Sequence, residues 1–429
     1  MSLLYDFLGL DLADESTRAA LAIVAITILA TLTTMALARS VLYPRRPSVI
    51  PNPLQTKIPA LSEKEVAKLE YKPDSYPGAR DVITPYGSIR VYEWGPEDGQ
   101  KVLFIHGIST SCMTVSRLAK AMVDRGYRVM LFDLFGRGFS DGVGDLPHDA
   151  RLYVSQALLA LASSPLPWTG TNSLRLVGYS MGGGIAVHFA SAFPHMVESL
   201  VLLAPAGLIR PQNFGIVSRV LFRSGLVPDR FVGELARIRL RKPIASSVTK
   251  KKSATPSPNR AGSPDDVVAV SADELHTALH RSGSQHHDHH HQKSIADLGA
   301  AEGADPPNPE HVTALEKRVL DYIAWMAEHH AGFVPAFLSS LRHAPLMDQH
   351  DSWVKIGERE PGSTCILLAR DDEIINPDDY RSDGLHLVGG EDRVTWTLVD
   401  GGHDFVMTHS RQIMQELDRF WGVKAELAN

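Results

Sequence analysis

Two shortages in this sequence, of cysteine and of net charge, narrow what the chain can be. Only two of its 429 residues are cysteines, Cys112 and Cys365, too few for a scaffold built on disulfides. The net charge of −6 offers no broad basic surface, so we expect no nucleic-acid partner. The sequence also has no Asn-x-Ser/Thr acceptor for N-glycosylation, which disfavours a lumenal or secreted domain. Hydrophobic residues make up 44%, enough for one large core or two modest domains.

Charge is also missing locally, from a stretch of twenty residues near the start of the chain. Residues 19–38 contain no charged side chain and lie between Arg18 and Arg39. As a helix, a stretch of this length matches a bilayer core about 30 Å thick. Acidic residues precede it, whereas Arg39, Arg45 and Arg46 follow it. The positive-inside rule then predicts a single-pass membrane anchor with the C-terminal bulk of the chain in the cytosol.

Two other interpretations of residues 19–38 stay open. A cleaved signal peptide would need a basic segment ahead of the apolar stretch, and this chain is acidic there. Residues 36–38 (Ala-Leu-Ala) would nevertheless serve as a cleavage site. A buried helix of a soluble protein is the other alternative, but a chargeless run of this length is unusual for one. We favour the membrane as a partner, bound through this N-terminal helix.

Beyond residue 79 the chain alternates strand and helix patterns. A hairpin is expected around residues 85–87, between short strand patterns at 82–84 and 89–92. Continuous apolar runs, separated mostly by helical segments, predict a largely parallel sheet covered on both faces. Functional side chains should then gather at the carboxyl ends of the strands. The expected strands of this sheet are 101–105, 128–132, 174–177, 200–203, 365–368 and 394–398.

These patterns divide the chain into six segments. They are an N-terminal tail (1–18), a transmembrane anchor (19–38), a proline-rich tether (39–78), the first part of a core domain (79–206), a helical cap (207–350) and the second part of the core (351–429). Inside the cap, residues 245–309 are poor in hydrophobic residues and rich in Ser, Pro, Asp and His. Such a composition buries too little apolar surface to fold, so we expect a disordered insertion there.

The histidines between His286 and His291 invite a metal interpretation. They lie in the expected insertion, with no second group of ligands and no supporting shell. We therefore interpret them as a low-complexity tract and expect no metal and no cofactor. The lysine run at residues 250–252 is likewise expected to be a solvated charge run, with contact to anionic lipid headgroups as the alternative.

The most specific pattern is Gly-Tyr-Ser-Met-Gly at residues 178–182. A strand pattern at 174–177 precedes it and a glycine-led helix start follows, which is the context that a nucleophile elbow requires. In such a turn the serine takes a strained backbone conformation, and the two glycines leave room for the neighbouring strand and helix. We predict Ser180 to be a nucleophile. The alternative is an ordinary Gly-Ser turn.

A serine hydroxyl is a poor nucleophile until a base takes its proton, and that base needs an acid to fix its tautomer. The expected base is His403, in a glycine-rich turn after the last predicted strand. Three adjacent carboxylates at 371–373 compete for the role of acid. We choose Asp372, because the apolar pair after Glu373 would anchor the loop and turn that carboxylate inward. Asp371 remains the alternative, and Glu373 is expected to face solvent.

Acyl transfer also places negative charge on the carbonyl oxygen of the substrate, where two backbone N–H groups normally meet it. One donor should belong to Met181, the residue after the nucleophile. The other should lie in the loop after the first long strand, where Ile108 is our choice. His106, in the same loop, is expected to be structural and should not be mistaken for the base.

In chain order these motifs resemble the α/β-hydrolase fold superfamily, in its serine lipase and esterase branch with a helical cap. The residues that carry the resemblance are His106–Gly107, 133–140 (Asp-Leu-Phe-Gly-Arg-Gly-Phe-Ser), Ser180, the Asp372 loop and 402–404. The resemblance implies a mostly parallel eight-stranded sheet flanked by helices, with an inserted cap. It implies the same site as the residues do: a triad of Ser180, Asp372 and His403, with Ile108 and Met181 as oxyanion donors. Two departures are the long insertion in the cap and Ala369, where many relatives carry glycine.

The N-terminal anchor ahead of such a domain is similar in architecture to the membrane-bound monoacylglycerol lipases of the superfamily. We therefore expect a membrane-anchored serine hydrolase that cleaves carboxylic esters of lipid-like substrates through an acyl-enzyme. Serine at the elbow argues against the dehalogenase and epoxide-hydrolase branches, which use aspartate there. Two alternatives stay open: an acyltransferase or thioesterase using the same serine, and a non-catalytic receptor on the same fold.

Overall fold

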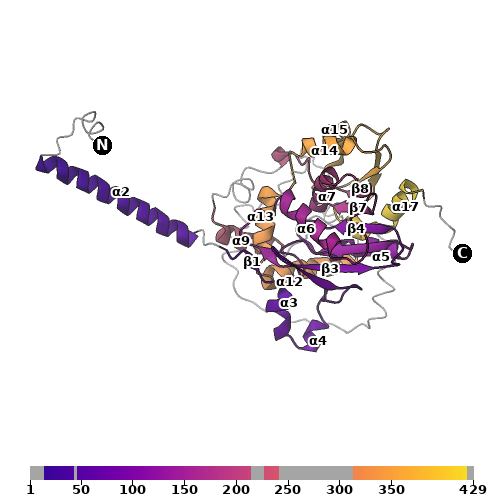
Figure 1. Ribbon diagram of the computed structural model, residues 1–429, viewed down its shortest axis with the longest axis horizontal. Helices are drawn as coiled ribbons and strands as arrows, with labels where there is room; N and C mark the ends of the chain where they lie inside the picture. Colours follow the sequence, from indigo (N-terminus) through magenta and orange to yellow (C-terminus); the bar gives the residue numbers. More distant parts are fainter. Residues whose placement is uncertain (1–13, 43–45, 214–226, 241–312, 423–429) are drawn as a thin grey trace, which may run out of the picture.

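The computed structural model describes residues 14–42, 46–213, 227–240 and 313–422, and its centre is an eight-stranded sheet surrounded by helices (Figure 1). The strands lie in the order β10-β9-β8-β7-β4-β5-β3-β2. Their bounds are β2 Arg80–Thr84, β3 Gly87–Trp94, β4 Lys101–Ile105, β5 Arg128–Phe132, β7 Leu174–Tyr179, β8 Val197–Leu203, β9 Thr364–Ala369 and β10 Thr395–Val399. The predicted eight-stranded sheet is confirmed.

The direction of the strands also follows the prediction. β2 and β3 form the expected hairpin, in which Thr84 lies opposite Gly87, and β3 also runs antiparallel to β5. All other neighbours in this sheet are parallel. The parallel strands are covered on both sides, and β9 is buried along its whole length. Their carboxyl ends therefore share one edge of the sheet, where the loops after β4, β7, β9 and β10 meet.

Helices flank the sheet in two groups. One group consists of α6, α7 and α14, and in the other α17 packs on α5 (Figure 1). The longer described helices are α2 Glu15–Leu42, α5 Ser116–Val123, α6 Ala150–Ala162, α7 Met181–Ala192, α9 Asp229–Leu240, α12 Ala314–His329, α13 Phe333–His343, α14 His350–Gly357, α15 Pro377–Gly384 and α17 Ser410–Phe420. Short elements are β1 Val49–Ile50, α3 Pro53–Thr56, η1 Ile58–Ala60, α4 Glu63–Val66, η2 Cys112–Val115, β6 Gly142–Val143, η3 Pro211–Asn213 and α16 Phe405–Thr408.

Helix α2 is longer than the predicted anchor and stands apart from the rest of the chain (Figure 1). None of its residues is buried. Three of its threonines, Thr27, Thr31 and Thr33, donate their hydroxyl protons to carbonyls one turn earlier, so these polar groups are satisfied within the helix. Thr27 Oγ1 lies 2.8 Å from the Ile23 oxygen, and Thr33 Oγ1 lies 2.7 Å from the Leu29 oxygen. Length and composition suit a membrane span or a signal sequence near the N-terminus.

The described part of the predicted tether, from residue 46 to 78, is packed on the body of the protein and is not a free linker. β1 pairs antiparallel with β6. Asn52 is buried and donates to Asp141 over 2.7 Å, and the fully buried Tyr71 donates its hydroxyl proton to Asp133 over 2.9 Å. Proline content suggested a linker, but these buried polar and aromatic side chains anchor the segment.

The first described residue after α2 is also tied to the body. Arg46 pairs with Asp229 at the start of α9, with 2.9 Å between Nη2 and Oδ2. Arg342, near the end of α13, pairs with the other oxygen of Asp229 over 2.7 Å. Arg46 is thus held directly on α9, and Asp229 links it to α13, in the region between β8 and β9.

That region is the predicted cap, residues 207–350. Its described helices α9, α12 and α13 pack on one another. α12 begins at a capping box, in which Glu316 N donates to Thr313 Oγ1 over 3.1 Å and the Glu316 carboxylate accepts from Thr313 N. The insertion predicted at 245–309 lies outside the described residues, and the role of the region as a cap stays a prediction.

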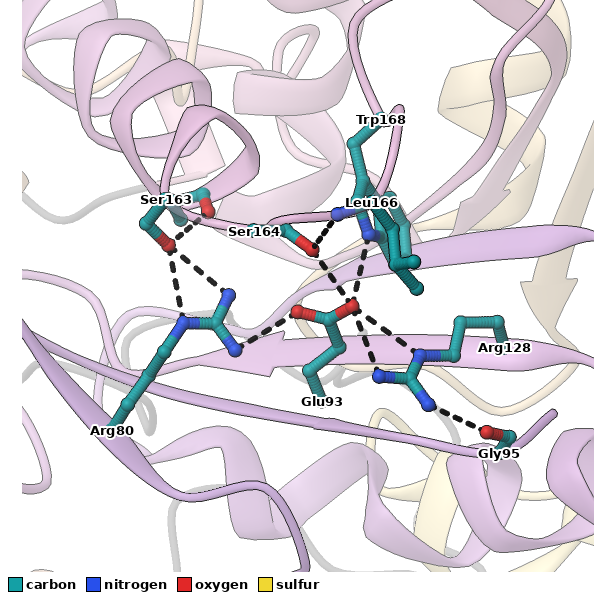
Figure 2. Close-up of polar contacts among 9 residues, drawn as sticks. Arg80, Glu93, Gly95, Arg128, Ser163, Ser164, Leu166 and Trp168 are labelled. Carbon is teal, nitrogen blue, oxygen red and sulfur yellow. Dashed lines mark hydrogen bonds and ion pairs between the residues drawn. The ribbon is translucent and has the colours of Figure 1, made fainter. Parts of the chain in front are cut away.

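At the antiparallel end of the sheet, a buried carboxylate joins two strands to the connection after α6 (Figure 2). Glu93 of β3 lies between Arg80 of β2, at 2.9 Å, and Arg128 of β5, at 3.2 Å. Ser164 and Trp168 also donate to its Oε1, from 2.9 and 3.1 Å. We call these five residues the Glu93 cluster.

Candidate active site

Ser180 occupies a sharp turn between β7 and α7. Its φ of 55° and ψ of −123° are strained for a residue with a side chain. The flanking glycines are needed for close approach. A Cβ at Gly178 would lie 2.4 Å from the Gly182 oxygen, and one at Gly182 would lie 2.1 Å from the Ile105 oxygen. The physical reason that the sequence suggested for this motif is therefore present.

His403 follows β10 and reaches the serine across the edge of the sheet. Its Nε2 lies 2.9 Å from Ser180 Oγ. The backbone of this loop is held by the residue before the serine, because the Tyr179 hydroxyl donates to the His403 carbonyl over 2.7 Å. The Tyr179 ring also packs against the imidazole, with 5.3 Å between ring centroids. The strained turn and the histidine loop therefore brace each other.

Of the three adjacent carboxylates, the structure brings Asp372 to the histidine. Asp372 Oδ2 lies 2.8 Å from His403 Nδ1. Its other oxygen accepts from the N–H groups of Ile374 and Ile375, each over 2.8 Å. Asp371, the alternative acid, and the neighbouring Glu373 are exposed. The apolar pair beyond the carboxylates thus turns Asp372 inward through its own backbone N–H groups.

The two expected oxyanion donors lie on either side of the serine. Met181 is the first residue of α7, where a backbone N–H has no partner within the helix. Ile108 lies in the loop after β4, and a Cβ added at Gly107 would be 3.5 Å from that of Ser180. The loop therefore approaches the nucleophile closely enough to contribute a donor, although the role of either N–H stays a prediction.

His106 orients this loop and does not act on the serine. Its Nε2 accepts from Leu134 N over 2.9 Å, which leaves the proton on Nδ1 to be donated to the Gly107 carbonyl over 2.9 Å. Burial, reinforced by the charge of Arg137, lowers the pKa of His106 to about 3. The ring is therefore neutral and fixed in one tautomer, as a structural residue should be.

Two residues near the site were not singled out from the sequence. Tyr179 holds the histidine loop, and Arg137 donates from Nε to the Ile108 carbonyl over 2.9 Å. Both lie inside quoted motifs, but only the folded contacts reveal what they bind. Within the described ranges no cluster of His, Cys, Asp and Glu could hold a metal ion. The histidines at 286–291 lie outside those ranges.

Comparison with known proteins finds similar sequences and a similar fold. A family model described as serine aminopeptidase, S33, matches residues 96–276. The solved structure of a bromoperoxidase from Bacillus anthracis covers 80% of this chain and 99% of its own, with a TM-score of 0.52 and 15% identity. The chain has the α/β-hydrolase fold.

Curated relatives are similar to this chain over shorter stretches. A serine hydrolase-like protein of Danio rerio is 32% identical over 126 residues, which are 29% of this chain and 37% of the relative. Lipase LipV of Mycobacterium tuberculosis is 34% identical over 118 residues, which are 28% of this chain and 42% of the relative. The chain thus spans less than half the length of either relative. Over these stretches the chain is similar to serine hydrolases and a lipase, and its own activity and substrates are matters for proposal.

Proposed function

We propose that this α/β hydrolase is a membrane-anchored enzyme that cleaves carboxylic esters of lipid-like substrates through Ser180, His403 and Asp372. One observation carries the proposal: an unbroken hydrogen-bond chain of 2.9 Å from Ser180 to His403 and 2.8 Å from His403 to Asp372. The order nucleophile, base and acid along this chain is what acyl transfer requires.

In the first step His403 Nε2 accepts the Ser180 proton while Oγ attacks the ester carbonyl. Asp372 Oδ2 keeps the other imidazole proton on Nδ1 and stabilises the imidazolium that forms. Since Oδ1 of Asp372 is already occupied by two backbone N–H groups, the carboxylate cannot rotate away from the ring. The negative carbonyl oxygen is met by the N–H groups of Ile108 and Met181.

Collapse of this intermediate breaks the ester C–O bond, and His403 returns its proton to the departing alcohol. The acyl group then remains on Ser180. Water enters, gives a proton to His403 and attacks the acyl carbon. A second collapse releases the carboxylic acid and restores the serine.

Several observations support a lipid-like substrate and a membrane location. Helix α2 has the length and composition of a span, and the segment after it is packed on the body of the enzyme. An anchor holds a site where apolar esters are concentrated. Similarity to lipase LipV supports the same substrate class. The basic residues after α2 favour a cytosolic catalytic domain.

A fluorophosphonate probe tests the nucleophile and the anchor together, because it reacts only with an activated serine. Native chain and Ser180→Ala are labelled in carbonate-washed membrane and soluble fractions. Ser191→Ala is the matched control, since its hydroxyl bonds within α7 to the Val187 carbonyl. We expect labelling in the membrane fraction that Ser180→Ala abolishes and Ser191→Ala retains.

Absence of labelling in the folded native chain would contradict the enzyme and favour a non-catalytic receptor. Labelling that survives Ser180→Ala would mean that another serine is the nucleophile. Labelling only in the soluble fraction would contradict the proposal that α2 anchors the enzyme in a membrane. Monoacylglycerols are then the first substrates to assay, and an added alcohol or thiol acceptor distinguishes hydrolysis from acyl transfer.

A further inference from the structure

Arg137 is completely buried, and its charge has an unusual set of partners. In the part of the chain that the structure describes, its hydrogen bonds all go to neutral oxygens. Nε donates to the Ile108 carbonyl over 2.9 Å, and Nη1 donates to the Phe135 carbonyl and the Tyr153 hydroxyl over 2.8 and 2.7 Å. Nη2 donates to Ser340 Oγ over 2.9 Å. Burying a cation without a carboxylate partner costs free energy, so a guanidinium held only by neutral oxygens needs an explanation.

One end of this network fixes the loop that carries a proposed oxyanion donor. His106 Nδ1 holds the Gly107 carbonyl, and Arg137 Nε holds the next carbonyl, that of Ile108. In a trans peptide the N–H points away from the carbonyl of the same unit. The first bond therefore aims the Ile108 N–H, and the second fixes the peptide plane that follows it. Two consecutive peptide units of the loop are therefore held by side chains, one by His106 from within the loop and the next by Arg137 from outside it.

The other end of the network lies on α13, in the predicted cap. The Ser340 hydroxyl donates to the Ala336 carbonyl over 2.7 Å, so its oxygen is left to accept from Arg137 and from Tyr153, the latter over 2.8 Å. The Ser340 proton is therefore directed at the Ala336 carbonyl, and the Tyr153 proton at Ser340 Oγ. The loop that carries Arg137 also lies close to α13, because a Cβ at Gly136 would lie 2.4 Å from that of Ala336.

We propose that Arg137 is a positioning residue that couples the seating of helix α13 to the geometry of the oxyanion loop. Ser340 is the contact on the helix and the Ile108 carbonyl is the contact on the loop. A planar guanidinium spans the two because its donors point in fixed and divergent directions, which a lysine ammonium cannot reproduce. The inference rests on the proposed function. It adds that chemistry at Ser180 depends on a contact made by the cap.

The test uses the full chain in detergent micelles. Hydrolysis of p-nitrophenyl butyrate is divided by the active sites titrated with a fluorophosphonate, so that misfolded molecules do not count. The inhibition constant of a trifluoromethyl ketone is measured in parallel, because its adduct places an oxyanion between the proposed donors. Ser340→Ala is compared with Ser339→Ala, one residue away on α13, whose hydroxyl instead accepts from His148 N.

We expect Ser340→Ala to lower kcat about fivefold to tenfold, as for the loss of one hydrogen bond, and to weaken the ketone by the same factor while KM stays within about twofold. Arg137→Lys keeps the charge but loses the fixed, divergent N–H donors of the guanidinium, and should lower kcat about a hundredfold. Ser339→Ala should match the native chain. If Arg137→Lys does not fold, Tyr153→Phe replaces it.

The inference is overturned if Ser340→Ala equals Ser339→Ala in kcat per titrated site and in ketone affinity. A merely structural contact would lower the melting temperature and the number of titrated sites while leaving both quantities unchanged. Full activity of Arg137→Lys would also overturn it, since charge alone would then suffice. Failure of the proposed function looks different, because the native chain would neither label nor hydrolyse the ester.

Discussion

Two buried carboxylates in this molecule have opposite surroundings. Glu93 lies between Arg80 and Arg128, whose charges are permanent, with Ser164 and Trp168 as further donors (Figure 2). Asp372 lies against a single imidazole and two backbone N–H groups. The first carboxylate is neutralised in every state of the protein, so it can only hold strands together.

The second carboxylate has a partner whose charge can change. When His403 takes a proton, Asp372 gains an ion pair that did not exist before. The contrast teaches that burial alone does not distinguish a structural carboxylate from one proposed to act in catalysis. What distinguishes them is whether the partner is a permanent cation or a ring that can become one, and each variant below tests one side of that difference.

The largest effect is expected for Asp372→Asn. The amide has the same shape but cannot hold the His403 proton on Nδ1, so kcat should fall on the order of 10⁴-fold, as in other triads. The melting temperature should change little. Steady-state ester hydrolysis per titrated site measures the loss, with the exposed Asp371→Asn as the matched control. Equal losses in the two variants would reassign the acid.

Glu93→Gln should reverse the pattern. It leaves two guanidinium groups without a counter-charge in a buried site, so the free energy of unfolding should fall by roughly 3 kcal/mol. Activity per titrated site should not change. Urea unfolding of the chain in micelles measures the loss, and Glu97→Gln, at an exposed position nearby, is the control. A fall in kcat without a fall in stability would contradict the contrast.

The same comparison extends to histidines and gives a smaller effect. His148 is buried like His403, but neither of its ring nitrogens has a hydrogen-bond partner among the described residues. Burial, with the nearby charge of Arg137, lowers the pKa of His148 to about 3. His148→Phe should therefore raise the free energy of unfolding at pH 7 by about 1 kcal/mol, because two unsatisfied nitrogens disappear.

The pH dependence follows from the sign of that shift. With its folded pKa depressed, His148 makes a pH-dependent contribution that is absent above the pKa of the unfolded chain, near 6.5, and that destabilises the folded chain increasingly as pH falls from there toward 3. Below pH 6.5 the loss approaches about 1.4 kcal/mol per pH unit for this histidine. His148→Phe and the polar His148→Gln should both remove this contribution, but only His148→Phe should gain stability at pH 7. An unchanged acid slope in both variants would refute the assignment.

Local patterns explain what the sequence could predict. The elbow at residues 178–182 is a short motif whose meaning depends on its immediate neighbours, and the apolar runs identified the strands. Asp372 was chosen over Asp371 by the apolar pair that follows, and the structure shows that the backbone of this pair binds the carboxylate. These features lie within a few residues of their cause.

Contacts between residues that lie far apart in the sequence explain what the sequence could not predict. Proline content predicts a tether over residues 39–78, where Tyr71 is buried against Asp133, 62 positions away. The bond from Arg137 to Ser340 joins residues 203 positions apart, and no local pattern indicates it. Before the fold is known, neither side chain differs from a surface tyrosine or arginine. Their roles depend on which loops the sheet brings together.

The bridge between Arg46 and Asp229 has a mechanical consequence. Arg46 lies four residues after the end of α2, and four residues of chain reach no further than ~14 Å in any conformation. In an enzyme anchored by α2, the catalytic body would therefore be held at a short, fixed height above the lipid surface. The catalytic body could rotate, and could diffuse with the anchor in two dimensions, but it could not move away from the membrane into the solvent. Its effective substrate concentration would then be set by what the adjacent leaflet contains.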